Sequence, residues 1–75
     1  MPFVDIKVIE GVFTAEEKRE LVERVSDAVI AVEGEALSPL THVAVTETPS
    51  GAWAVGGSAK TADEVIALRS APAAV

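Results

Sequence analysis

Pro2 is the residue of this chain whose position suggests chemistry, because it directly follows the initiator methionine. Removal of Met1 would turn the nitrogen of Pro2 from a tertiary amide into a secondary amine. An exposed α-amino group titrates near about pH 7.7–8.0, and apolar surroundings lower its pKa further. A base with a pKa near neutrality suits proton abstraction beside a carbonyl group. A Met-Pro start by itself indicates only efficient removal of Met1. Whether Pro2 is catalytic therefore depends on the rest of the chain.

Other kinds of catalytic or metal site find little support in the residue types. The chain contains no cysteine, which excludes disulfides and thiolate metal sites. Its single histidine, His42, cannot form a zinc site by itself, so no metal is expected. Serine and aspartate are present as well, but no nucleophile elbow accompanies them and a catalytic triad is not indicated.

The length of 75 residues allows one domain, residues 1–75, in which we expect residues 70–75 to form a loose tail. A domain this short buries little of its surface and needs an additional source of stability. Disulfides and metals are excluded as that source, and 49% of the residues are hydrophobic. Composition therefore predicts a homo-oligomer.

The net charge of −6 argues against a nucleic-acid partner and against an anionic membrane surface. No apolar run approaches the length of a membrane span, and the N-terminus lacks a signal-peptide pattern. We therefore expect a cytoplasmic protein without nucleic-acid or membrane partners.

The first half of the chain predicts a strand followed by a long helix. Residues 2–10 alternate between apolar and polar side chains, the pattern of a strand with one buried face. Thr14 and Glu17 form a capping-box motif, after which apolar residues recur at helical spacing. Gly34 is expected to end this helix.

The second half predicts shorter elements. Residues 41–46 read as a second strand, and residues 53–55 as a short third strand after a turn cluster. A second capping motif at Thr61 predicts a short helix to about Leu68. The result is an α+β chain with a β-α-β unit and a C-terminal hairpin. One face of the two-stranded sheet takes the helix, and a neighbouring subunit would have to cover the other.

The order of several short motifs resembles the 4-oxalocrotonate tautomerase family. No single piece is specific, but the ordered set from Pro2 to about Gly57 is. The pieces are Pro2 opening an alternating strand, Ile9-Glu10-Gly11, a capped helix with Val25-Ser26-Asp27-Ala28-Val29, Ser38-Pro39-Leu40-Thr41, Thr46-Glu47, and Trp53-Ala54-Val55-Gly56-Gly57.

The resemblance implies a cofactor-independent isomerase built from β-α-β subunits that assemble as dimers and then as hexamers. It implies that Pro2 moves a proton between two carbons of a small enol or keto acid, as in the breakdown of aromatic compounds. Arginines would bind the oxygens of the substrate, and Trp53 would form an aromatic wall of the pocket.

The chain departs from the family at the expected arginines. The arginine that follows the first strand would fall at Val12. The arginine of the second strand aligns with His42 or with Ala44, depending on the motif from which one counts. Because these two positions share a strand face, His42 is a candidate substrate-binding donor. Its alternative role is structural.

We therefore predict a tautomerase with Pro2 as the general base and His42 and Trp53 as substrate-binding residues. A first alternative is a hydratase or dehalogenase of the same superfamily, in which a protonated proline delivers a proton and an acidic side chain activates water. A second alternative is a non-catalytic oligomer with the same fold.

Overall fold

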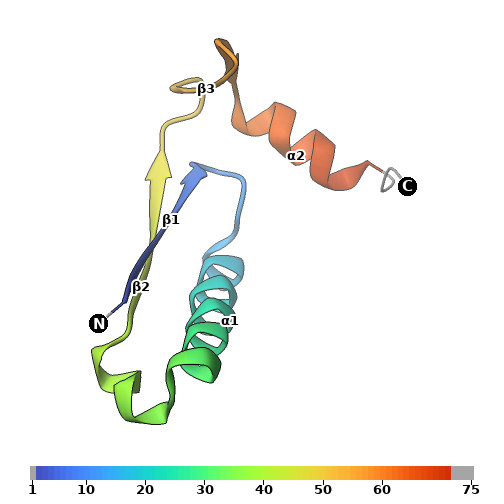
Figure 1. Cartoon of the computed structure of the whole chain (residues 1–75). Helices are drawn as coiled ribbons and strands as arrows, with labels where there is room; N and C mark the ends of the chain where they lie inside the picture. The colour runs from blue at the N-terminus through green and yellow to red at the C-terminus, as the bar shows by residue number, and fades with distance from the viewer. Residues whose placement is uncertain (1, 72–75) are drawn as a thin grey trace. The chain divides into compact units, whose positions relative to one another are not determined.

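The computed structural model of the protein describes residues 2–71 (Figure 1). The elements in chain order are β1 (Phe3–Ile9), α1 (Ala15–Glu33), the 3-10 helix η1 (Glu35–Leu40), β2 (His42–Thr48), β3 (Trp53–Val55), β4 (Ser58–Lys60) and α2 (Ala62–Ser70). They confirm the predicted α+β class and the β-α-β subunit with a C-terminal hairpin. The chain divides into two units, one with residues 2–7 and 13–46 and one with residues 8–12 and 47–71.

Strands β1 and β2 pair in a two-stranded sheet, and Figure 1 shows them pointing in the same direction. At the start of the pair, the N–H of His42 donates to the carbonyl of Pro2 at 3.1 Å. At its end, the N–H of Glu10 donates to the carbonyl of Thr48 at 2.7 Å. The parallel pairing makes α1 the crossover connection between the two strands.

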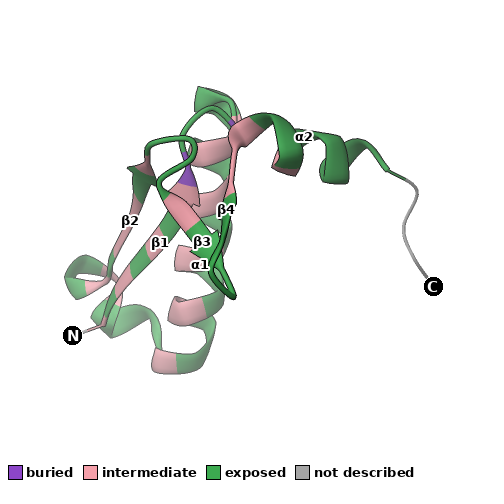
Figure 2. Ribbon diagram, turned by 90° about the horizontal axis from the view of Figure 1, so that it is seen from above, coloured by how far each residue is buried: buried purple, intermediate pink, exposed green. Residues whose placement is uncertain are grey.

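The predicted alternation of β1 is confirmed in the first unit. Val4 and Ile6 are half-buried, whereas Phe3, Asp5 and Lys7 are exposed (Figure 2). Successive side chains of a strand point to opposite faces of the sheet, so one face of β1 is apolar and covered while the other is open.

Helix α1 begins where the capping box predicts. The N–H of Thr14 donates to Oε1 of Glu17 at 2.9 Å, and the N–H of Glu17 donates to Oγ1 of Thr14 at 3.1 Å. The helix ends at Gly34, whose N–H donates to the carbonyl of Ile30 at 2.8 Å. Gly34 has a φ of +102°, a conformation that a side chain would make costly.

Helix η1 lies between α1 and β2, where sequence analysis predicts no element. The fixed φ of proline is compatible with a short helical turn, and Pro39 lies inside η1. The hydroxyl of Thr41 lies 3.0 Å from the carbonyl of Leu37, which is one of two possible acceptors for its single proton. Strand β2 starts one residue later than predicted, at His42, and continues two residues further, to Thr48.

In the second unit, β3 pairs with β4 as an antiparallel hairpin. Val55 lies opposite Ser58, so Gly56 and Gly57 alone form the loop. Their φ values of +58° and +82° are those that a two-residue hairpin loop of type I′ requires, and glycine adopts them without strain. The sequence predicted a C-terminal hairpin and the strand that begins at Trp53, but not the bounds of the partner strand β4.

Helix α2 extends through Ser70 and so corrects the predicted helix end near Leu68. In its last turn, Nη1 of Arg69 donates to the carbonyl of Val12 at 2.9 Å, which attaches the helix to another part of the second unit. The predicted loose tail otherwise falls on residues 72–75, which lie outside the described residues.

Few side chains are buried within this single chain. Among residues 2–71, the buried hydrophobic residues are Ile9 and Val12, each 7% exposed and both in the second unit. Large apolar side chains remain open to solvent, including Phe3 at 68% and Val32 at 91%. No helix within the described part is long and apolar enough to cross a membrane.

Candidate active site

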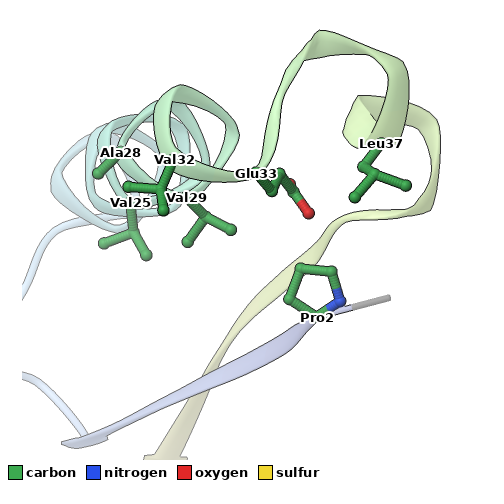
Figure 3. Close-up of a pocket in the computed structure, with 7 residues that line it drawn as sticks. All are labelled: Pro2, Val25, Ala28, Val29, Val32, Glu33 and Leu37. Carbon is green, nitrogen blue, oxygen red and sulfur yellow. The ribbon is translucent and has the colours of Figure 1, made fainter.

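Pro2 lies in an open hollow of about 770 Å³ in the first unit, at the start of β1. The hollow is bounded by the C-terminal half of α1 and by η1 (Figure 3). Its lining residues are Pro2, Val25, Ala28, Val29, Val32, Glu33 and Leu37. Sites for small molecules commonly have volumes of about 300–1,000 Å³ and mostly apolar walls, and this hollow has both properties.

Backbone pairing fixes Pro2 at this place. Its carbonyl accepts the N–H of His42, which ties the first described residue to the start of β2. Proline has no N–H to give to the sheet, so a strand can begin with it without losing a ladder bond. Figure 3 shows the ring of Pro2 with Glu33 and Leu37 across from it. Removal of Met1 would therefore leave a secondary amine at the wall of the hollow.

The apolar wall comes from one side of α1. Val25, Ala28, Val29 and Val32 recur at the spacing of three and four residues that places side chains on one helix face. Val32 is 91% exposed although it borders the hollow, so this end of the apolar stripe has no cover within the chain. If a partner covered such walls, an amine beside them would lose solvation, which favours its neutral, basic form.

One charged group, Glu33, interrupts the apolar lining. Its Oε2 accepts a hydrogen bond from the hydroxyl of Thr41. Its Oε1 is buried and has no hydrogen-bond partner among the described residues. Sequence analysis missed Glu33, although a signal exists. It follows Val29 by four residues and so falls on the apolar stripe of α1, where a carboxylate is out of pattern.

His42 presents its backbone, but not its ring, to Pro2. The imidazole ring stacks on Phe3, with centroids 6.2 Å apart and an interplanar angle of 20°. Phe3 belongs to the exposed side of β1, and His42 is exposed as well. The residues that line the hollow do not include His42. Within one chain, a backbone hydrogen bond thus joins His42 to Pro2, while the ring of His42 lies against Phe3 and outside the hollow.

A small polar network occupies the same exposed side of the sheet. The hydroxyl of Thr46 donates to Oδ1 of Asp5 at 2.8 Å, and Nζ of Lys7 lies 2.8 Å from Oδ2 of Asp5. These two interactions, that with Lys7 being the larger, lower the pKa of Asp5 below its ordinary value. Lys7 is therefore engaged with Asp5.

Trp53 and Val12 lie in the second unit. Trp53 is half-buried in β3 and pairs with Lys60 of β4. Val12, at the position where the resemblance implies an arginine, is buried, and its carbonyl is bound by Arg69. The role of Trp53 as a pocket wall stays a prediction.

Metal ligands do not gather in the described residues. Within residues 2–71, no group of three or more histidine, aspartate or glutamate side chains is placed to hold a metal ion. Among the described lining residues, Glu33 and, after loss of Met1, Pro2 carry the groups that can exchange a proton.

Comparisons with known proteins place the chain in a family. The profile of the family described as Tautomerase enzyme matches residues 2–63. A structure of a 4-oxalocrotonate tautomerase isozyme from Methylibium petroleiphilum shares 33% identity with a TM-score of 0.68, over 85% of this chain and 97% of that one. YwhB, a homologue of 4-oxalocrotonate tautomerase, shares 35% identity with a TM-score of 0.66, over 84% and 97%.

A third similar structure is DmpI from Helicobacter pylori, with 29% identity and a TM-score of 0.67, over 85% of this chain and 94% of that one. Curated protein sequences include no significant match. The family profile covers most of the chain, and two of these structures exceed 30% identity over nearly their whole length. The chain belongs to the tautomerase family.

Proposed function

We propose that this protein is a keto-enol tautomerase that moves a proton between carbons of a small enol or keto acid, with Pro2 as the general base after removal of Met1. The observation that carries the proposal is the position of Pro2 in an open, mostly apolar hollow of a tautomerase-family chain. The free amine would take a proton from one carbon and return it to another, so no cofactor has to take part.

The test combines intact mass with a ketonisation assay on aryl or alkyl enolpyruvates. In a preparation whose mass shows loss of Met1, Pro2→Ala keeps a primary amine but loses the ring. A positioned general base accelerates a reaction by about 10²–10⁴-fold. Because the primary amine of the variant keeps part of this effect, we expect kcat/KM to fall by only about 10- to 100-fold. Pro49→Ala is the matched control, because Pro49 is an exposed turn residue of the second unit.

Two results would refute this role of Pro2. Equal activity of Pro2→Ala and the unchanged protein would show that the proline is not the base. Full activity of protein that retains Met1 would show the same, because a tertiary amide has no basic nitrogen. Absence of activity in the unchanged protein, in Pro2→Ala and in Pro49→Ala, with every acid tried, would favour the non-catalytic alternative.

A hydratase or dehalogenase is the second candidate, and Glu33 favours it. Such an enzyme needs an acidic side chain to activate water, and Glu33 places a carboxylate in the hollow of Pro2. Product analysis separates the two reactions. A tautomerase yields an isomer of unchanged mass, whereas a hydratase adds one water and a dehalogenase releases halide.

We also infer that the protein acts as a symmetric homo-oligomer, which the resemblance suggests is a hexamer. The exposed side chains of Phe3 and Val32 and the small number of buried residues support association. Sedimentation at micromolar concentration tests this inference. A stable, folded monomer would contradict it.

A further inference from the structure

We propose that Glu33, held by Thr41, is the hydrogen-bonding partner of the Pro2 amine and stabilises its protonated form once Met1 is removed. Oε1 of Glu33 would accept an N–H of the Pro2 ammonium, while Oε2 stays bound to the hydroxyl of Thr41. Glu33 is thereby a positioning residue that sets when Pro2 carries its proton. Its meaning for catalysis rests on the proposed function, but proton binding by Pro2 can be measured without any activity.

The two oxygens of Glu33 differ in their surroundings. Oε2 has the Thr41 hydroxyl as a donor, whereas Oε1 is buried without a donor among the described residues. A buried carboxylate oxygen without a hydrogen bond is costly, and such groups in folded proteins almost always have a partner. The free oxygen of Glu33 therefore indicates a donor that the described residues do not supply.

Removal of Met1 creates such a donor in the same hollow. The Met1–Pro2 peptide nitrogen is a tertiary amide and carries no hydrogen, whereas a protonated secondary amine carries two. Pro2 and Glu33 line one hollow, and Figure 3 shows the carboxyl group of Glu33 extending from α1 toward the side on which Pro2 lies.

Among the described lining residues, no other side chain offers a donor to Oε1 of Glu33. Apart from Glu33, the described lining of the hollow consists of proline, valine, alanine and leucine side chains, which have no donor. On β2 the ring of His42 stacks on Phe3, and on β1 Lys7 is paired with Asp5. On η1, Glu35 is exposed and does not line the hollow.

The pairing has a measurable consequence for Pro2. An opposite charge within about 4–6 Å favours the charged form of a group and shifts its pKa by about one pH unit or more. The valines of α1 act in the opposite direction, because apolar walls favour the neutral amine. Glu33 would thus hold the pKa of Pro2 above the value that the walls alone would give.

The experiment titrates the Pro2 amine by NMR in ¹⁵N-proline-labelled protein that has lost Met1. Glu33→Gln keeps the size of the side chain and removes its charge, so the pKa of Pro2 should fall by about one pH unit. Glu35→Gln, an exposed change in the neighbouring helix, should leave it unchanged. An unaltered pKa of Pro2 in folded Glu33→Gln would overturn the proposal.

A second measurement uses the unsubstituted sequence, in case Glu33→Gln does not fold. The ¹³C resonance of the Glu33 carboxyl group should follow the titration of Pro2 in processed protein. In protein that retains Met1, that step should be missing. The same carboxyl titration in both forms would overturn the pairing.

Failure of this proposal can be told apart from failure of the proposed function. If Pro2→Ala lowers activity as expected while Glu33→Gln leaves the Pro2 titration unchanged, the catalytic proline stands and the pairing is refuted. If Glu33→Gln lowers the pKa of Pro2 while Pro2→Ala remains fully active, the pairing stands and the proposed base is refuted.

Discussion

Thr41→Val should destabilise the protein by removing the hydroxyl that donates to Glu33, while the shape of the side chain is kept. Hydrogen bonds to charged groups contribute about 1.5–3 kcal/mol, and the lower end applies because this contact is only part-buried. We expect the free energy of unfolding to fall by about 1.5 kcal/mol. In a domain of this size, that loss lowers Tm by about 6–12 °C.

Thr46→Val is the matched control, because it also removes a hydroxyl bound to a carboxylate. The bond from Thr46 to Asp5 is exposed, so water can replace it and the loss of stability should be smaller than that of Thr41→Val. Both variants are unfolded in urea at one fixed protein concentration, since association would contribute to the measured stability.

A double-mutant cycle with Glu33→Ala assigns the effect to the pair. Residues in direct contact show coupling energies of about 0.5–3 kcal/mol, and we expect about 1 kcal/mol between Thr41 and Glu33. If Thr41→Val lowers the free energy of unfolding as much in the Glu33→Ala background as in the unchanged protein, the hydroxyl of Thr41 does not stabilise the fold through Glu33. The carbonyl of Leu37 would then be its relevant partner.

Three further outcomes follow from the structure. Thr14→Ala removes the N-cap of α1 and should cost about 1 kcal/mol in thermal unfolding followed by circular dichroism. Lys7 and Thr46 lower the pKa of Asp5 in the folded protein, so the ionised carboxylate stabilises the fold. This contribution to the free energy of unfolding is fully present above the ordinary pKa of about 3.8 and is lost as the pH falls through the lower pKa of the folded state. Asp5→Asn should accordingly be less stable than the unchanged protein near pH 6, by a margin that shrinks in acid. With a carboxylate in the hollow, kcat/KM should be higher for an enolpyruvate monoacid than for a muconate-type diacid, and Glu33→Gln should narrow that preference.

The elements that the sequence predicted are those with a local cause. The capping box at Thr14 depends on residues three apart, and the alternation of β1 depends on which side chains can be buried. Gly34 ends α1 through its own backbone conformation. In each case a few neighbouring residues contain the whole physical reason, so no distant contact was needed to predict them.

The parts that were not predicted depend on pairing or on packing. Strand β4 is short, and it exists because Gly56 and Gly57 turn it back onto β3. Helix η1 surrounds Pro39, in a stretch where sequence analysis predicted no element. A polar residue at a helix end normally lies in solvent, whereas Glu33 lines the hollow because the end of α1 borders it together with Pro2.

The charges of the hollow also bear on where a substrate carboxylate binds. Glu33 contributes a negative charge, and a protonated Pro2 would neutralise it, so the pair offers an acid no net attraction. Lys7 is engaged with Asp5, and Arg69 with a carbonyl of the second unit. A buried carboxylate needs a cationic or strong donor partner, and we expect that partner from a neighbouring protomer. Proton transfer would then need one chain, because Pro2 and Glu33 belong to the same protomer. Binding of the substrate carboxylate would need the assembly, because its donor comes from a neighbouring protomer.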